Sequence, residues 1–112
     1  MKILKFRDYL VPLVLSGEKN STWRVFDDKD LKVCDEIELQ VFVTNQTFAK
    51  AKITKVVQKR FRDLSESDRQ GHEKYKNDDE MYAEYTKYYK APVNADTTLK
   101  VIWFELKPNS SE

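Results

Sequence analysis

The segment from Gly17 to Arg24 holds the residues of this sequence that are best suited to chemistry. It carries an ammonium on Lys19, a hydroxyl on Thr22 and a guanidinium on Arg24. If a β-strand begins at Asn20, its period of two places Thr22 and Arg24 on the same strand face. Together these groups can bind an anion or the polar edge of a nucleobase, or they can act on a carbonyl group.

The reactivity of this segment depends on Lys19. Desolvation and the nearby guanidinium of Arg24 both disfavour a charged lysine, and a neutral Lys19 can act as a general base. A threonine hydroxyl beside such a lysine is a candidate nucleophile, which gives that role to Thr22. The alternative is structural: a β-strand with Thr22 and an ion-paired Arg24 on its solvent face. The residues alone leave both interpretations open.

A second candidate site is a basic run between positions 50 and 62 that contains no acidic residue. We predict that it forms a patch that binds nucleic acid, with side chains from Lys50, Lys52, Lys55, Lys59 and Arg60. Acidic segments at 25–49 and 63–86 surround this run. The alternative interpretation is a solvent-exposed strand face whose charge is balanced by these neighbouring acids.

The elements that must position these residues follow from hydrophobic periodicity. Apolar residues between positions 6 and 14 predict an amphipathic helix that is capped by Asp8 and ends at Gly17. Alternating patterns predict strands at 2–5, 20–25, 36–43, 47–58 and 98–106, and capping signatures predict helices at 65–71 and 77–89. A slip in the alternation at Val56 and Val57 predicts a β-bulge. This order predicts an α+β fold, a small mixed β-barrel flanked by two or three helices.

Other residues give weaker signals. His72 lies between two expected helices, and it either closes over a ligand or forms a structural hydrogen bond. Trp23 alternates away from Thr22 and is expected in the core, and Cys34 is expected to be a buried thiol without a catalytic base. An apolar stripe at helical spacing also predicts core packing: Met81, Tyr82, Tyr85, Tyr88 and Tyr89.

Length and composition exclude several classes of protein. With 112 residues, 40% of them hydrophobic, the chain has the size of one domain. We expect that domain to span 1–107 and a polar tail to follow at 108–112. The 20 lysines and arginines nearly cancel the 19 aspartates and glutamates, so no global basic excess points to nucleic acid.

Composition also constrains cofactors and location. The single Cys34 excludes an internal disulfide, and with only one histidine a Cys/His zinc site is not expected. We therefore expect no metal and no cofactor. The sequence shows neither a signal peptide nor an apolar run of about 20 residues, so we expect a cytoplasmic monomer that does not bind membranes.

The residues spaced as GxKxxTxR from Gly17 to Arg24 resemble the signature of the ASCH family, the activating signal cointegrator homology domains. As in that family, they follow an apolar helix. Lys32–Leu39 resembles the family's lysine-x-glycine-aspartate approach to the next strand, with Cys34 where glycine is usual. The resemblance covers essentially the whole chain. It implies a PUA-like β-barrel with a cleft suited to RNA or a modified nucleobase.

Binding of RNA or a nucleotide in that cleft is the first function that the resemblance implies. The partner is then RNA or a modified nucleoside. The ligand-binding residues would be the four motif positions and the histidine of the later loop: Gly17, Lys19, Thr22, Arg24 and His72.

The alternative function is enzymatic. Some members of the family are metal-independent amidohydrolases that remove the acetyl group of N4-acetylcytidine. The resemblance makes Lys19 the base and Thr22 the nucleophile, with a glutamate as the third residue. We assign Glu73 to that position, while Gln70 and Glu66 occupy alternative registers.

A third, minor hypothesis is a protein-interaction module that docks through the tyrosine-rich helix. It requires Tyr82, Tyr85 and Tyr89 to be substantially exposed. If these rings are buried, docking through the helix is excluded and binding in the cleft remains.

Overall fold

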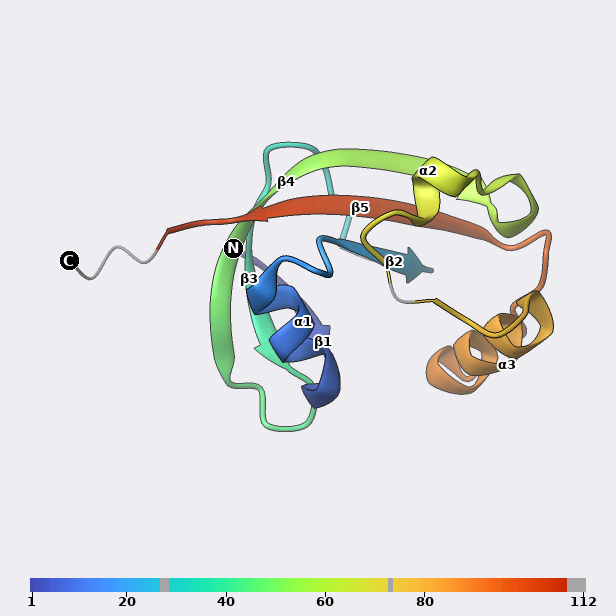
Figure 1. Cartoon of the computed structure of the whole chain (residues 1–112), viewed down its shortest axis with the longest axis horizontal. Helices are drawn as coiled ribbons and strands as arrows, with labels where there is room; N and C mark the ends of the chain where they lie inside the picture. The colour runs from blue at the N-terminus through green and yellow to red at the C-terminus, as the bar shows by residue number, and fades with distance from the viewer. Residues whose placement is uncertain (27–28, 73, 109–112) are drawn as a thin grey trace.

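Figure 1 shows the computed structural model of the protein, in which residues 1–26, 29–72 and 74–108 are described. The elements follow the predicted order: β1 (Lys2–Phe6), α1 (Val11–Ser16), β2 (Ser21–Val25), β3 (Glu36–Val41), β4 (Thr47–Arg60), α2 (Glu66–Arg69), α3 (Asp78–Tyr89) and β5 (Thr98–Leu106). Two 3₁₀ turns, Asp8–Leu10 and Phe61–Asp63, precede α1 and α2. None of the helices in these described ranges is long and apolar enough to cross a membrane.

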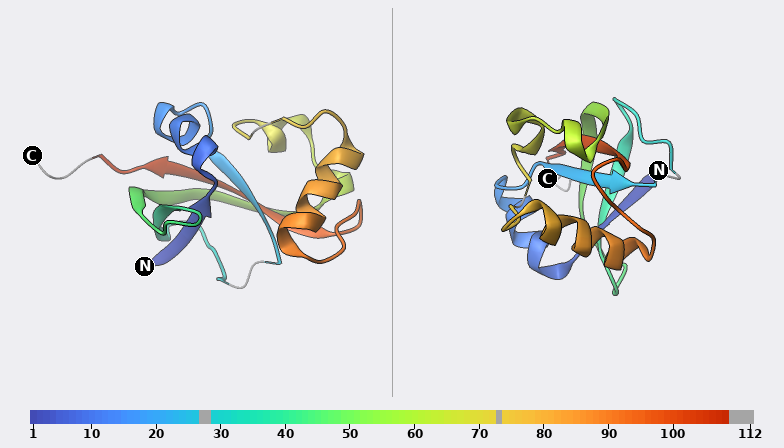
Figure 2. Two further views of the ribbon diagram at one scale, coloured as in Figure 1. Left: turned by 90° about the horizontal axis from the view of Figure 1, so that it is seen from below. Right: turned by 90° about the vertical axis from the view of Figure 1, so that its right-hand side faces the viewer.

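The five strands form one mixed sheet in the order β1-β3-β4-β5-β2. β1 runs parallel to β3, and the other neighbouring pairs are antiparallel. The sheet curves into a half-barrel, with α1 and α3 on either side of β2 (Figures 1 and 2). This confirms the predicted α+β fold with a mixed sheet and flanking helices. It also makes β2, which carries the motif, an edge strand.

The core consists of two clusters of buried side chains. The first lies among β1, β3, β4 and α1, and its most buried members include Leu4, Ile37, Leu39 and Ile53. The second joins β2 and β5 to α3 and to the turn after β4; it contains Trp23, Phe61, Met81, Leu99 and Val101. Full burial of such a side chain stabilises the fold by about 1.5–3 kcal/mol. The second cluster therefore fixes α3 against β2.

The end of α1 delivers the motif to β2. Gly17 has a φ of +87°, a left-handed conformation that glycine adopts without a Cβ penalty. Its N–H donates to the carbonyl of Val14 at 3.1 Å, and the N–H of Lys19 donates to that of Leu13 at 3.0 Å. The expected cap at Asp8 is wrong: the chain first forms a 3₁₀ turn, which lacks a side-chain cap, and α1 starts only after it.

Two further local expectations are corrected by the structure. The bulge in β4 lies at Thr54, because the register with β5 shifts between Ile53 and Lys55 rather than at Val56. Cys34 is exposed, not buried. Its φ of +76° belongs to a tight turn before β3, and such a turn lies at the surface. A glycine would meet the same backbone demand without strain.

Candidate functional site

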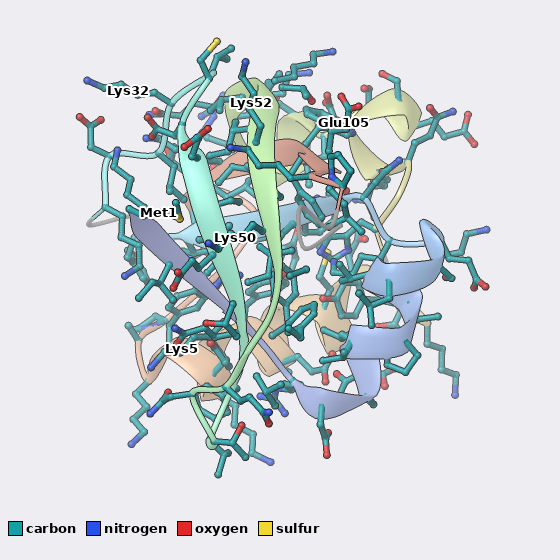
Figure 3. The ribbon with its side chains drawn as sticks, turned by 90° about the vertical axis from the view of Figure 1, so that its left-hand side faces the viewer. Met1, Lys5, Lys32, Lys50, Lys52 and Glu105 are labelled. Carbon is teal, nitrogen blue, oxygen red and sulfur yellow. The ribbon has the colours of Figure 1, made fainter. Side chains whose placement is uncertain are left out.

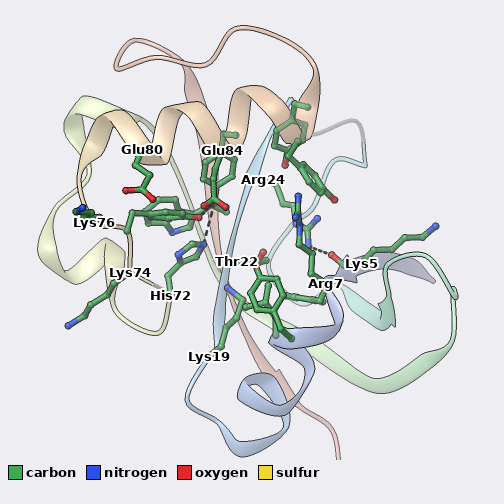
Figure 4. A pocket seen from close by; sticks show the side chains of 18 residues that line it. Lys5, Arg7, Lys19, Thr22, Arg24, His72, Lys74, Lys76, Glu80 and Glu84 are labelled. Atoms are coloured by element: carbon green, nitrogen blue, oxygen red, sulfur yellow. Dashed lines mark hydrogen bonds between the residues drawn. The ribbon is translucent and has the colours of Figure 1, made fainter.

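A pocket of about 330 Å³ opens between β2, the end of β1, α3 and the loop that follows α2 (Figure 4). Its lining is both basic and aromatic. The basic side chains are Lys5, Arg7, Lys19, Arg24, Lys74 and Lys76. The aromatic rings are Phe6, Tyr9, Trp23, Tyr75, Tyr85, Tyr88 and Tyr89, beside His72. Two acidic side chains, Glu80 and Glu84, complete the charged groups that the described residues bring to the wall.

The structure brings four of the proposed ligand-binding residues into this pocket: Lys19, Thr22, Arg24 and His72. The fifth, Gly17, lies outside the lining and acts through its backbone conformation. Of the registers considered for a third catalytic residue, Glu66 and Gln70 also lie outside the lining. Glu73 lies outside the described residues, so its assignment stays a prediction.

Lys19 and Thr22 form the floor of the pocket. Lys19 is 3% exposed and Thr22 is 5% exposed, although both carry polar groups. The Lys19 Nζ donates to the main-chain oxygen of Ser21 at 2.7 Å and lies 6.0 Å from the ring centre of Phe6. Figure 4 shows its side chain ending beside Thr22. An amine and a hydroxyl are thus held together, largely away from water.

The outer edge of β2 is closed by specific hydrogen bonds. The Ser21 N–H donates to the carbonyl of Gly71 at 3.2 Å, while the Ser21 carbonyl accepts from Lys19. The Val25 N–H donates to the hydroxyl of Tyr89 at 3.2 Å. Unpaired strand edges invite pairing with other chains, and these contacts occupy the edge on both sides of the pocket.

The loop at Gly71 holds His72 in the pocket wall. The Gly71 carbonyl accepts a second hydrogen bond, from the Asn20 N–H at 3.0 Å. The backbone at Gly71 is left-handed, with a φ of +77°. The His72 ring then stacks on Trp23, with 4.0 Å between ring centres and 16° between the planes. Its Nε2 lies 3.5 Å from the hydroxyl of Tyr85. His72 is therefore oriented by β2 and α3 together.

Trp23 combines a core position with a place in the pocket wall. It is 3% exposed and belongs to the second core cluster, as its alternation predicted. It nevertheless lines the pocket, and its Nε1 has no hydrogen-bond partner in the described part of the structure. Because His72 covers one face of the indole, Trp23 is not an open stacking platform for a base.

The aromatic stripe of α3 divides between the core and the pocket. Met81 is fully buried and Tyr82 packs on Phe61, as core packing predicted. Three further rings of the stripe line the pocket: Tyr85, Tyr88 and Tyr89. All four tyrosines are half-buried, so the substantial exposure that the protein-interaction hypothesis requires is not seen.

Sequence reasoning missed the acidic pair of α3 and the basic residues at the end of β1. Glu80 and Glu84 are four residues apart and therefore share the helix face of Tyr88, which is a signal that could have identified them. Arg7 directly follows β1, where no periodic pattern indicates its direction. Only the packing of α3 against the sheet shows that these residues meet.

The residues of the predicted basic patch lie outside the pocket lining. Lys50 and Lys52 project from β4 on the face shown in Figure 3, opposite Glu38 and Glu36 of β3. A hydrogen bond from Lys107, with smaller contributions from Lys52 and Lys50, holds the pKa of Glu36 below its ordinary value. Acidic neighbours thus offset the positive charge of Lys50 and Lys52 at this end of the basic run.

The other residues of the predicted basic patch also contact neighbouring side chains. The Lys59 Nζ lies 2.6 Å from a carboxylate oxygen of Asp68, and the Arg60 Nε lies 3.2 Å from one of Asp63. Lys55 lies over the ring of Trp103, 4.8 Å from its centre. Binding of nucleic acid by this surface stays a prediction, and the pocket is the better-formed site.

Asp68 connects the end of β4 to the loop that carries His72. Burial raises the pKa of Asp68, but hydrogen bonds from Lys59 and from Ser65 outweigh it, so the net pKa is below the ordinary value. The Ser65 and Asp68 side chains also form the predicted capping box of α2. The charged carboxylate is therefore the form that stabilises this corner.

We expect Asp68→Asn to lower the free energy of unfolding by about 1 kcal/mol at neutral pH. A carboxyl with a depressed folded-state pKa contributes stability above its unfolded pKa and loses it as pH falls through the folded pKa. The difference between wild type and variant should therefore be complete at neutral pH, begin to shrink as pH falls to about 4, and vanish only below the lower, folded-state pKa of Asp68. Urea unfolding across pH measures it, with the exposed Asp63→Asn as control. A difference that does not shrink at all as pH falls from neutral to about 2 would contradict this assignment.

Fold and pocket together define a class: an α+β half-barrel of the PUA-like kind, with a basic and aromatic pocket at its open edge. No family model and no curated protein matches the sequence. Solved structures do match. The protein EF3133 of Enterococcus faecalis V583, described under the family model DUF984, superimposes with a TM-score of 0.74 at 21% identity, over 96% of this chain and 76% of that one.

Two ASCH structures have the same fold. The ASCH domain of Lactobacillus crispatus JV V101 gives a TM-score of 0.63 at 13% identity, covering 94% of this chain and 79% of that one. The ASCH protein of Zymomonas mobilis gives 0.64 at 12% identity, covering 92% and 65%. The chain therefore has the fold of the ASCH domains, as the GxKxxTxR resemblance implied.

Proposed function

We propose that this protein binds a nucleotide, free or within RNA, in the pocket at the open edge of the half-barrel. The observation that carries the proposal is the lining: among the described residues, six basic side chains and seven aromatic rings converge on one small pocket, against two acidic groups. Aromatic rings contact nucleobases of any sequence, and basic groups contact phosphate oxygens. The resemblance of the GxKxxTxR segment to the ASCH family implies the same class of ligand.

The size of the pocket favours a single nucleotide. Its volume of about 330 Å³ lies at the lower end of the range for small-molecule sites. Its polar floor, made by Lys19 and Thr22, is dominated by hydrogen-bond donors. Such a floor suits a ligand that presents oxygen or ring-nitrogen acceptors, which every nucleobase has. A longer strand would have to extend beyond the pocket.

We expect purified protein to bind ribonucleotides, and the Kd to rise with salt. For single-stranded RNA, the logarithm of the association constant should fall with the logarithm of salt concentration by roughly 0.7 per phosphate contact. Calorimetric titration with the four ribonucleotides and a short RNA measures this, and quenching of Trp23 fluorescence provides a second signal. Failure of every nucleoside, nucleotide and RNA to bind at millimolar concentration would refute the proposal.

The burial of Lys19 beside Thr22 supports a second candidate, metal-independent hydrolysis of an N4-acylated cytosine nucleoside. The Thr22 Oγ1 would attack the acyl carbon while Lys19 takes the hydroxyl proton. The proton would then pass to the departing amine, and water would hydrolyse the acyl-threonine ester. To test this activity, the protein is incubated with N4-acetylcytidine and a chelator, and the release of cytidine is measured by chromatography. No release from a folded protein that binds cytidine would reject it.

A further inference from the structure

The two arginines that line the pocket differ from the other arginines of the protein. The sequence has five arginines, and three of them are ion-paired: Arg60 and Arg62 with Asp96, and Arg69 with Asp78. Among the described residues, neither Arg7 nor Arg24 has a carboxylate within ion-pair distance. These two guanidinium groups thus keep their charge available to a ligand.

Both groups are held in place without an acidic partner. The guanidinium of Arg7 lies over the ring of Tyr88, 5.3 Å from its centre, and that of Arg24 lies 5.4 Å from the ring centre of Phe6. Arg24 also donates from Nη2 to the Lys5 carbonyl at 3.0 Å. Stacking on a ring orients the planar fork and leaves its N–H edges free to bind.

Arg24 has a donor that none of the described residues satisfies. Its Nε is buried and has no hydrogen-bond partner in the described structure. A buried N–H without an acceptor is destabilising, and an oxygen of a ligand would remove that penalty. Figure 4 shows Arg24 and Arg7 together at the end of the pocket near Lys5, across from His72 and Lys74.

We infer that Arg7 and Arg24 form a phosphate subsite, so that the ligand of this pocket is a phosphorylated nucleoside rather than a free one. This inference rests on the proposed function. Two guanidinium groups can hold the oxygens of one phosphate through charge-assisted, bidentate hydrogen bonds, for which arginine is better suited than lysine. The aromatic middle of the pocket, with Tyr85 and Tyr89, then takes the base.

The experiment compares each ribonucleoside with its 5′- and 3′-monophosphate by calorimetry, using wild type, Arg7→Gln and Arg24→Gln. We expect wild type to bind one monophosphate about tenfold or more tightly than the nucleoside. Arg7→Gln, at an exposed position, should remove most of that preference, lowering the affinity for the monophosphate far more than the affinity for the nucleoside. Arg7→Lys should restore only part of it. Arg62→Gln, which disrupts an existing ion pair outside the pocket, is the matched control.

The outcomes separate the inference from the proposed function. Equal affinity for nucleoside and monophosphates in wild type would overturn the phosphate subsite while leaving nucleobase binding intact. An Arg7→Gln variant that weakens nucleoside and monophosphate binding equally would overturn it as well. A dinucleotide is titrated as well, to distinguish a terminal phosphate from the phosphodiester of an RNA strand. The form of phosphate whose affinity falls in Arg7→Gln is the form that the subsite binds.

Discussion

Gly71→Ala is expected to lower the melting temperature by roughly 5–10 °C and to weaken nucleotide binding. At a φ of +77° an alanine is strained by about 1–2 kcal/mol. Its Cβ would also lie 1.8 Å from Oδ1 of Asn20. Relief of either conflict moves the Gly71 carbonyl, which accepts from the N–H groups of Asn20 and Ser21. His72 would then lose its stacked position on Trp23.

Two controls separate the causes of this loss. Gly17→Ala imposes the same backbone strain at a φ of +87°, but its Cβ would meet nothing within 4 Å. In an Asn20→Ala background, the contact part of the Gly71→Ala effect should disappear and the strain part should remain. Thermal denaturation of these variants and a nucleotide titration measure both effects. A Gly71→Ala protein with wild-type melting temperature and affinity would show that this loop does not position the site.

Lys19→Met is expected to weaken nucleotide binding between about tenfold and a hundredfold, the usual range for loss of a hydrogen bond from a charged group. Methionine retains the length and apolar contacts of the side chain but removes the amine. The Ser21 carbonyl, which accepts from Lys19, loses that donor, so a smaller loss of stability accompanies the loss of binding.

The exposed Lys50→Met is the matched control, because it removes the same charge from β4 outside the pocket. Titration calorimetry provides the affinity, and thermal denaturation shows whether each variant is folded. A folded Lys19→Met protein with wild-type affinity would place Lys19 in a structural role alone. Thr22→Val extends the test to the neighbouring hydroxyl, which would donate or accept a hydrogen bond at the same floor.

Local patterns were sufficient to predict the elements that carry the site. Hydrophobic patterning predicted a strand at 98–106, and β5 (Thr98–Leu106) lies there, between β4 and β2. Ser65 with Asp68 predicted the start of α2, and Asn77 predicted that of α3. Each of these signals depends on residues a few positions apart, whose relative placement is fixed by helix or strand geometry.

Local patterns were weaker where a residue serves two environments. Trp23 was expected in the core, and its contact with Phe61 agrees with that expectation. Its place in the pocket wall depends on His72, which a separate loop brings within 4.0 Å. Periodicity assigns a residue to one face of a strand, but it does not show what a distant loop places on that face.

The sequence by itself determined the order of strands and helices, the α+β class and the GxKxxTxR resemblance. Tertiary structure alone decided where charge accumulates. The net charge is only +1, and the basic run at 50–62 predicted a positive patch on β4. In the structure, Lys59 and Arg60 of that run pair with aspartates. The pocket instead collects basic groups from β1 and the residue after it, from β2 and the turn before it, and from the loop after α2. These segments meet only because β1 pairs with β3 and β2 with β5, and such long-range pairing leaves no local pattern in the chain.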